Sequence, residues 1–197
     1  KVWRDDGDAE TYARSDLSVA YRAPYVAHQP LEPLNAVALV TETNAEIWTA
    51  HQMPRIVQNR VAEGAGLSPD EVTVHNQAAG GSFGHRLEFE VVDRAVEIAR
   101  ALPGRHIKLT FSREEDFAQD HPRQIAAARA NGSVEAGRVL ALELQIAAPS
   151  PIRSQMGRMG LPVPGPDMQI VAGAWNMPYD IPNLRVRGYA APELAPI

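Results

Sequence analysis

The stretch Ala78-Ala79-Gly80-Gly81-Ser82-Phe83-Gly84-His85-Arg86 lies between an expected strand, residues 72–76, and a long amphipathic segment. Three glycines around one aromatic residue cost conformational entropy and add little packing, so the run needs a physical reason. A tight strand-to-helix turn, which requires positive φ, is one reason. The other is that main-chain N–H groups at a helix N-terminus could approach an anion or a polar cofactor. The stretch matches neither the dinucleotide-binding motif nor the P-loop.

Composition narrows the classes of partner. The 197 residues carry 19 basic and 24 acidic side chains, a formal net charge of −5, which argues against nucleic acid and against an anionic membrane surface. The chain has no cysteine, which excludes disulfides and any iron–sulfur cluster held by this chain. No apolar run reaches the roughly 18 residues of a membrane span, so no span is expected. Small molecules and other proteins are the expected partners.

Apolar periodicity and turn residues divide the chain into short strands and two main helices. Pro54 suits the first turn of a helix that ends at Gly64 and Gly66. Apolar residues from Leu87 to Leu102 recur at three- and four-residue spacing and predict the second helix. Strands are expected at 35–40, 45–49, 72–76, 107–111, 124–134 and 138–148. Because no steady βαβ rhythm appears, the predicted fold is α+β, a mixed β-sheet with packed helices.

The remaining segments have less regular patterns. Residues 1–16 are polar and are expected to be a surface lead-in or the end of a linker, with residues 17–197 forming part of one domain. Residues 149–168 are rich in Pro, Gly and Met, and are expected to be a mobile binding loop or a segment ordered by other parts of a longer chain. Residues 169–189 are expected to be mostly extended. The chain is interpreted as a piece of a longer protein.

Known catalytic motifs are scarce. The six histidines do not have the spacing that places two imidazoles on one helix face, so no metal site is expected. No nucleophile elbow is present. The acidic run Glu114-Glu115-Asp116 is typical of a solvated helix start. Glu32, between two prolines, is a more unusual carboxylate, although a surface or capping role is the default.

Five segments together resemble one known family. They are Tyr21–His28, Leu31–Ala36, residues 47–54 with Ile47-Trp48 and His51-Gln52-Met53-Pro54, Gly80–Glu88, and Ser112–Asp116. In this order they resemble the molybdenum-binding subunit of the xanthine oxidase family. The double-proline segment and the Phe-Gly-x-Arg-Leu-Glu ending are most similar to the isoquinoline 1-oxidoreductase β-subunit branch, which includes aldehyde-oxidising relatives. The implied domain is a molybdopterin cofactor-binding domain, truncated before its C-terminal half.

The resemblance also implies roles for particular residues. The glycine loop would border the molybdenum and its pterin through Gly80, Gly81, Ser82, Phe83 and Gly84. Gln52 would hydrogen-bond the oxo ligand of the metal, and Arg123 would stabilise negative charge near the substrate. Leu87 stands where xanthine-type enzymes carry a substrate-binding glutamate, which disfavours purines. The family's catalytic base, a glutamate in a Gly-x-Gly-Glu segment, has no counterpart here.

The implied activity is hydroxylation of an N-heterocycle or an aldehyde at a molybdopterin centre, with oxygen from water. The cofactor would be the cytosine dinucleotide form, electrons would pass to iron–sulfur clusters on a small partner subunit, and the isolated piece would be inactive without bound cofactor. A periplasmic location would fit this branch. The alternatives are a non-catalytic α+β interaction or scaffold domain and a degenerate relative. A scaffold would bury Gln52 and Phe83 in a core, whereas a cofactor wall would leave them facing a cavity.

Overall fold

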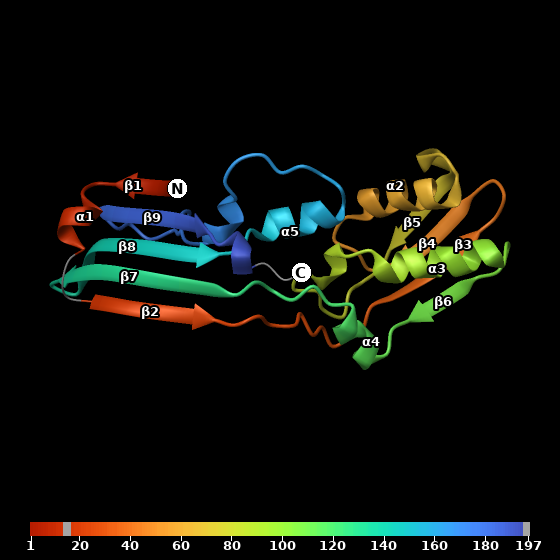
Figure 1. Ribbon diagram of the computed structural model, residues 1–197, viewed down its shortest axis with the longest axis horizontal. Helices are drawn as coiled ribbons and strands as arrows, with labels where there is room; N and C mark the ends of the chain where they lie inside the picture. The colour runs from red at the N-terminus through yellow and green to blue at the C-terminus, as the bar shows by residue number, and fades with distance from the viewer. Residues whose placement is uncertain (14–16, 195–197) are drawn as a thin grey trace. The chain divides into compact units, whose positions relative to one another are not determined.

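The computed structural model describes residues 1–13 and 17–194, which divide into two compact units (Figure 1). Unit 1 comprises Lys1–Val26 and Pro122–Ile197, and unit 2 comprises Ala27–His121. Each unit has its own β-sheet, and each sheet contains both parallel and antiparallel pairs. The predicted fold of mixed sheets with packed helices is therefore confirmed.

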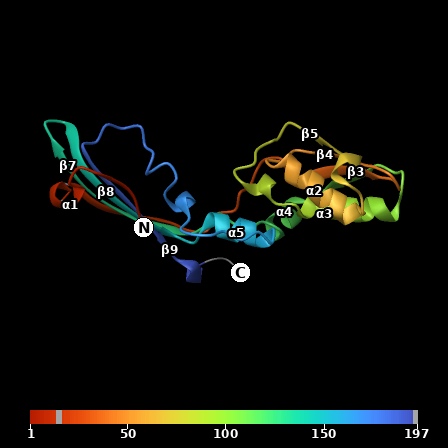
Figure 2. The ribbon, with the colours of Figure 1, turned by 90° about the horizontal axis from the view of Figure 1, so that it is seen from above.

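Unit 2 is a four-stranded sheet covered on one face by two helices (Figure 2). The strand order is β5-β4-β3-β6, with β5 and β4 parallel and the other pairs antiparallel. Every second residue of β3 and β4 is buried, as expected for strands with one face on a core. The elements are β3 (Asn35–Val40), β4 (Ala45–Thr49), α2 (Pro54–Ala65), η1 (Pro69–Glu71), β5 (Val72–Asn76), η2 (His85–Leu87), α3 (Glu90–Ala101), β6 (Ile107–Thr110) and α4 (Arg113–Ala118).

Helix α2 forms where the sequence predicts it. Pro54 occupies the first turn, and Gly66 ends the helix with a left-handed φ of 74°. Helix α3 is also confirmed, but it begins at Glu90, because residues 85–87 form a separate 3-10 turn. The helical phase therefore starts later than the apolar spacing suggested. Ile98, one of the apolar residues in this spacing, is 40% exposed, whereas Val92 and Val96 are buried together with Val91 and Ala95.

Unit 1 is a five-stranded sheet of order β1-β9-β8-β7-β2. Its centre is the predicted hairpin of β7 and β8, whose turn residues Ala136 and Gly137 both have positive φ. Strand β9 adds parallel to β8, and β2 adds antiparallel to β7. The elements are β1 (Val2–Asp6), α1 (Ala9–Tyr12), β2 (Leu17–Ala23), β7 (Ala126–Glu135), β8 (Arg138–Ala148), α5 (Pro151–Arg158), η3 (Met168–Val171), β9 (Asn183–Ala190) and η4 (Pro192–Leu194).

The N-terminal segment contains a strand and a short helix, which its polar composition did not predict. Val2–Asp6 forms the edge strand β1, antiparallel to β9, and the short helix α1 follows. These residues are mostly polar and still form a strand, because an edge strand that pairs with β9 needs no buried face on both sides. The interpretation of residues 1–16 as a surface lead-in or the end of a linker stays a prediction. The expected boundary after residue 16 adjoins residues 14–16, which lie outside the described residues, and stays a prediction.

The segment expected to be a mobile loop, 149–168, contains helix α5. The Ser150 hydroxyl accepts from the Arg153 amide at 3.1 Å and donates to Asp167 Oδ2 at 2.6 Å, so it caps the helix and holds the returning chain. The following residues are not mainly extended either. Ile170 and Val171 are buried in the core of unit 1, in a 3-10 turn packed on β8 and β9, and extended structure resumes only at β9.

Candidate functional site

Each glycine of the loop between β5 and η2 has a packing reason. A Cβ on Gly80 would lie 2.5 Å from Cβ of Glu32, and one on Gly81 would lie 3.2 Å from Cβ of Pro30. Gly81 and Gly84 also have φ of 101° and 113°, which L side chains rarely adopt. The double-proline segment thus packs directly against the loop. Glycine content alone is explained by this packing and does not require a cofactor.

The buried side chain of Arg86, which is 1% exposed, supports the loop through hydrogen bonds. Its Nε donates to the carbonyl of Gly81 at 2.8 Å, and its Nη2 contacts Glu32 Oε2 at 2.7 Å. The same Glu32 oxygen accepts the Gly80 amide at 2.7 Å, and Glu32 Oε1 accepts the Asn35 side-chain amide at 3.0 Å. A buried arginine joined to one carboxylate and to loop carbonyls is a rigid support. The sequence predicted neither the support of the loop by Arg86 nor the contact between Glu32 and Arg86.

Acidification is expected to weaken this support. Hydrogen bonds from the Gly80 amide and the Asn35 side chain, together with the Arg86 charge, hold the pKa of Glu32 below its ordinary value of 4.5. A carboxylate with a lowered folded-state pKa stabilises the fold above its unfolded-state pKa, and this contribution is lost as the pH falls through the folded-state value. As the pH falls below 4.5, the free energy of unfolding of unit 2, measured with urea, should decrease more in the wild type than in Glu32→Gln. Parallel losses in both proteins would contradict this expectation.

The loop has an exposed side chain and several backbone amides that are free to contact a ligand. Phe83 is 68% exposed and has a φ of 59°, unusual for a residue with a side chain. The backbone N–H groups of residues 81–84 have no hydrogen-bond acceptor among residues 1–13 and 17–194. Consecutive free amides in a glycine-rich turn form a concavity that attracts anions. The loop does not lead directly into a long helix, because α3 begins only at Glu90, so these amides do not lie at the N-terminus of the long helix that the sequence predicted.

Gln52 lies beside this loop on the connection between β4 and α2. Its Oε1 accepts the Ser82 hydroxyl, and its backbone amide donates to the carbonyl of Arg86 at 2.9 Å. Within the described part of the chain, Gln52 Nε2 has no acceptor and can donate to a ligand. Both Gln52 and Phe83 are exposed, so neither is part of a core. A scaffold core would have buried both side chains, and the expectation that they face a cavity stays a prediction.

His51 is a positioning residue that sequence patterns did not indicate. Its Nε2 contacts the carbonyl of Glu88 at 3.1 Å, and its Nδ1 accepts the Met53 amide at 3.0 Å, which fixes the backbone on both sides of Gln52. Burial lowers the pKa of His51, and the Glu88 carbonyl partly opposes this effect. The neutral ring, with Nε2–H donating and Nδ1 accepting, matches both bonds.

The other predicted site residues lie at different places. Arg123 belongs to unit 1, where its side chain is exposed and its backbone pairs with Val26. Gln52 and Gly80–Gly84 belong to unit 2, which brings them together. Leu87 lies half-buried in the 3-10 turn η2. The role of each as a cofactor or substrate contact stays a prediction.

Comparison with known proteins defines the class. The sequence pattern of the molybdopterin cofactor-binding domain matches residues 2–192, and the chain belongs to this family. Among curated relatives, it is 35% identical over 145 residues to the isoquinoline 1-oxidoreductase subunit beta of Brevundimonas diminuta, covering 71% of this chain and 18% of that protein. It is 28% identical over 150 residues to the membrane-bound aldehyde dehydrogenase [pyrroloquinoline-quinone] of Gluconacetobacter polyoxogenes, covering 75% of this chain and 19% of that protein.

A solved structure has the same fold. The aldehyde oxidoreductase of Desulfovibrio gigas superposes with a TM-score of 0.67 at 22% identity, covering 93% of this chain and 20% of that one. The resemblance to xanthine oxidase-type molybdenum enzymes, inferred from five short motifs, is thereby confirmed. The chain spans about a fifth of the length of the curated relatives it matches. Among the described residues, no helix is long and apolar enough to cross a membrane.

Proposed function

We propose that this chain forms one wall of the molybdopterin site in an oxidoreductase that hydroxylates an N-heterocycle or an aldehyde. The observation that carries the proposal is the loop itself: free amides at residues 81–84 and an exposed Phe83, held by a fully buried arginine. These groups fit an anionic, partly aromatic cofactor, because amides donate to its oxygen and phosphate atoms while the phenyl ring excludes water.

Each residue of the wall would make a different contact with the cofactor or with its neighbours. The amides of Gly81, Ser82 and Gly84 would bind anionic oxygen atoms, and Gln52 Nε2 would donate to an oxo group. When bound, the molybdenum centre would accept two electrons from the substrate carbon while oxygen from water is added to it. Ser82 would orient Gln52, since its hydroxyl donates to Gln52 Oε1 while accepting the Arg86 amide. Because this network is set before a ligand arrives, binding would cost little reorganisation.

Other parts of the reaction would come from elsewhere. Arg123 would stabilise negative charge on the substrate, and the catalytic base would lie outside these 197 residues, in the remainder of a larger subunit. A chain without cysteine would pass its electrons to iron–sulfur clusters on a small partner subunit. The names of the relatives support the substrate classes, since one is an isoquinoline oxidoreductase and another an aldehyde dehydrogenase. The cytosine dinucleotide form of the cofactor belongs to the same proposal.

The test is the molybdenum and pterin content of the complete open reading frame that contains these residues, co-expressed with a small iron–sulfur subunit. Mass spectrometry of the double variant Gln52→Ala, Phe83→Ala should find retained molybdenum reduced by about tenfold or more, since contacts around a metal typically change its affinity by about 10–100-fold. The matched control is Gln77→Ala with Phe117→Ala, an exposed glutamine and an exposed phenylalanine of the same unit. This control should retain its molybdenum.

A scaffold function is the second candidate, because packing accounts for all three loop glycines. It predicts that the folded wild-type protein contains neither molybdenum nor pterin. A degenerate relative predicts the same content while keeping the fold. A double variant that retains as much molybdenum as the control would also contradict the proposed wall, since its two exposed ligand side chains would then be dispensable.

A further inference from the structure

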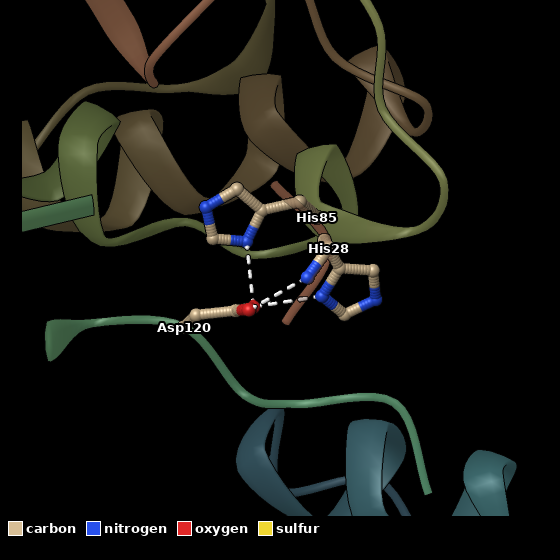
Figure 3. Close-up of side chains that lie close together, drawn as sticks. All are labelled: His28, His85 and Asp120. Carbon is tan, nitrogen blue, oxygen red and sulfur yellow. Dashed lines mark hydrogen bonds and ion pairs between the residues drawn. The ribbon is translucent and has the colours of Figure 1, made fainter. Parts of the chain in front are cut away.

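A second cluster of polar side chains lies in unit 2. Its residues come from the segment that precedes β3, from η2 and from the segment after α4. Figure 3 shows the rings of His28 and His85 each directing a nitrogen at the carboxylate of Asp120. His28 Nδ1 lies 2.7 Å and His85 Nδ1 lies 3.0 Å from Asp120 Oδ1. One potential ligand atom from each of the three residues falls within 4.8 Å of the others.

The inner histidine has an unsatisfied nitrogen. His85 is 1% exposed, and its Nδ1 makes no hydrogen bond of acceptable geometry among the described residues, although Asp120 Oδ1 is close. A buried polar atom without a partner is rare in a native protein and calls for a specific explanation, such as an ion. A cation between Asp120 and the two imidazoles would replace the 2.7 Å hydrogen bond between His28 Nδ1 and Asp120 Oδ1. It would also give His85 Nδ1 a partner and neutralise the carboxylate.

The outer nitrogen of His85 has the partner that metal-binding histidines commonly have. His85 Nε2 lies 3.2 Å from Asp116 Oδ1, and Asp116 is itself buried and held by the Leu34 amide at 3.0 Å and by Arg113 Nη1 at 2.9 Å. A carboxylate on the far nitrogen fixes the proton there, so that the near nitrogen presents a lone pair to the metal. With its proton on Nε2, facing Asp116, His85 has the tautomer that metal binding through Nδ1 requires.

The geometry points to a Zn²⁺ site formed by His28, His85 and Asp120. Two imidazoles and one carboxylate are borderline ligands that suit zinc among the common divalent ions, and a fourth position would be left for water. The side chain of His28 is 11% exposed, which leaves an approach from solvent. This inference does not depend on the proposed oxidoreductase function.

The expected role of the ion is structural. His28 and Asp120 are 92 residues apart in the sequence, so a metal would cross-link segments that otherwise meet only through hydrogen bonds. His85 directly follows Gly84, and a Cβ on Gly84 would lie 3.0 Å from His28 Nε2. The zinc site would therefore pin the end of the glycine loop. No metal site was expected from the sequence, because the usual short spacing between histidines is absent.

The test is titration with ZnCl₂ by calorimetry of the metal-free protein encoded by the complete open reading frame that contains these residues, beside the visible spectrum of the Co²⁺-loaded protein. We expect one ion per chain, a higher unfolding temperature with zinc, and a cobalt spectrum with the intense bands of a low-coordinate nitrogen and oxygen site. His28→Ala and Asp120→Asn should each weaken binding by about tenfold or more, in line with the loss of a metal contact. Circular dichroism of the metal-free variants checks that they fold.

Two comparisons make the outcome decisive. His75→Ala removes another histidine that is paired with a carboxylate in unit 2, Glu46 at 2.9 Å, and should leave zinc affinity unchanged. His121→Ala alters the second group of close ligand atoms, which includes Glu90. The proposal is overturned if no stoichiometric binding occurs, or if affinity is lost in His121→Ala and kept in Asp120→Asn. If His28→Ala does not fold, Asp120→Asn and the wild-type cobalt spectrum still decide.

Discussion

Replacing Arg86 with methionine is expected to lower the free energy of unfolding of unit 2 by about 3–5 kcal/mol, the cost typical of breaking a buried ion pair. Methionine fills much of the same volume but donates no hydrogen bond. The carbonyls of Gly81 and Glu32 would lose their donors, and the Glu32 carboxylate would lose its cation. Because Glu32 is partly exposed and keeps the Gly80 amide, we expect the lower end of this range.

Urea unfolding followed by the fluorescence of Trp48 measures this change. Trp48 is the tryptophan of unit 2, and Trp3→Phe with Trp175→Phe silences those of unit 1. The matched control is Arg60→Met, which removes an arginine with an equally short carboxylate contact, 2.7 Å to Asp93, on the exposed surface. The control should cost less than about 1 kcal/mol, since water already solvates both charges. Equal effects of the two substitutions would show that burial of Arg86 is unimportant.

Substituting Gly80 with alanine is expected to destabilise unit 2 by about 1–3 kcal/mol, the usual cost of overpacking a close contact. The added methyl would lie 2.5 Å from Cβ of Glu32, so the loop or the double-proline segment must move. Either movement lengthens the bond between the Gly80 amide and Glu32, and with it the support under the loop. Retention of molybdenum by the complete protein should therefore fall together with stability.

The control for this substitution is Gly64→Ala. Gly64 lies within α2 with helical φ, and nothing lies within 4 Å of the position of an added Cβ. Alanine should stabilise the helix there by about 0.5–1 kcal/mol, because glycine loses more backbone entropy on folding. The two alanine variants should thus differ in sign in the same unfolding experiment. A stable Gly80→Ala protein would mean that the loop relaxes freely and is not rigidly held.

Together these variants distinguish the residues that support the loop from the residues that would contact the ligand. Arg86 and Gly80 act on the loop from the side of the double-proline segment, whereas Gln52 and Phe83 are exposed. Variants of the first pair should change stability and molybdenum content together. Variants of the second pair should change molybdenum content with little change in stability, since exposed side chains contribute little to folding.

Local sequence determined much of the architecture of this protein. The first-turn Pro54 and the terminal Gly66 define α2, and the turn at Ala136 and Gly137 defines the β7–β8 hairpin. These features depend on the backbone preferences of a few neighbouring residues, so they can be predicted from the local sequence. The glycine loop and its flanking motifs likewise indicated the molybdopterin-binding family, which the comparisons confirmed.

Only the tertiary structure decided what lies across from these elements. The pairing of β1 with β9, the Arg86–Glu32 support and the approach of His28 to Asp120 all join residues far apart in the chain. Local patterns cannot encode such contacts, because their energies depend on which segments the whole fold brings together. For the same reason a polar strand and a helix within the proline-rich segment 149–168 were missed. The glycines were visible in the sequence, but the close approach that requires them is a property of the folded protein.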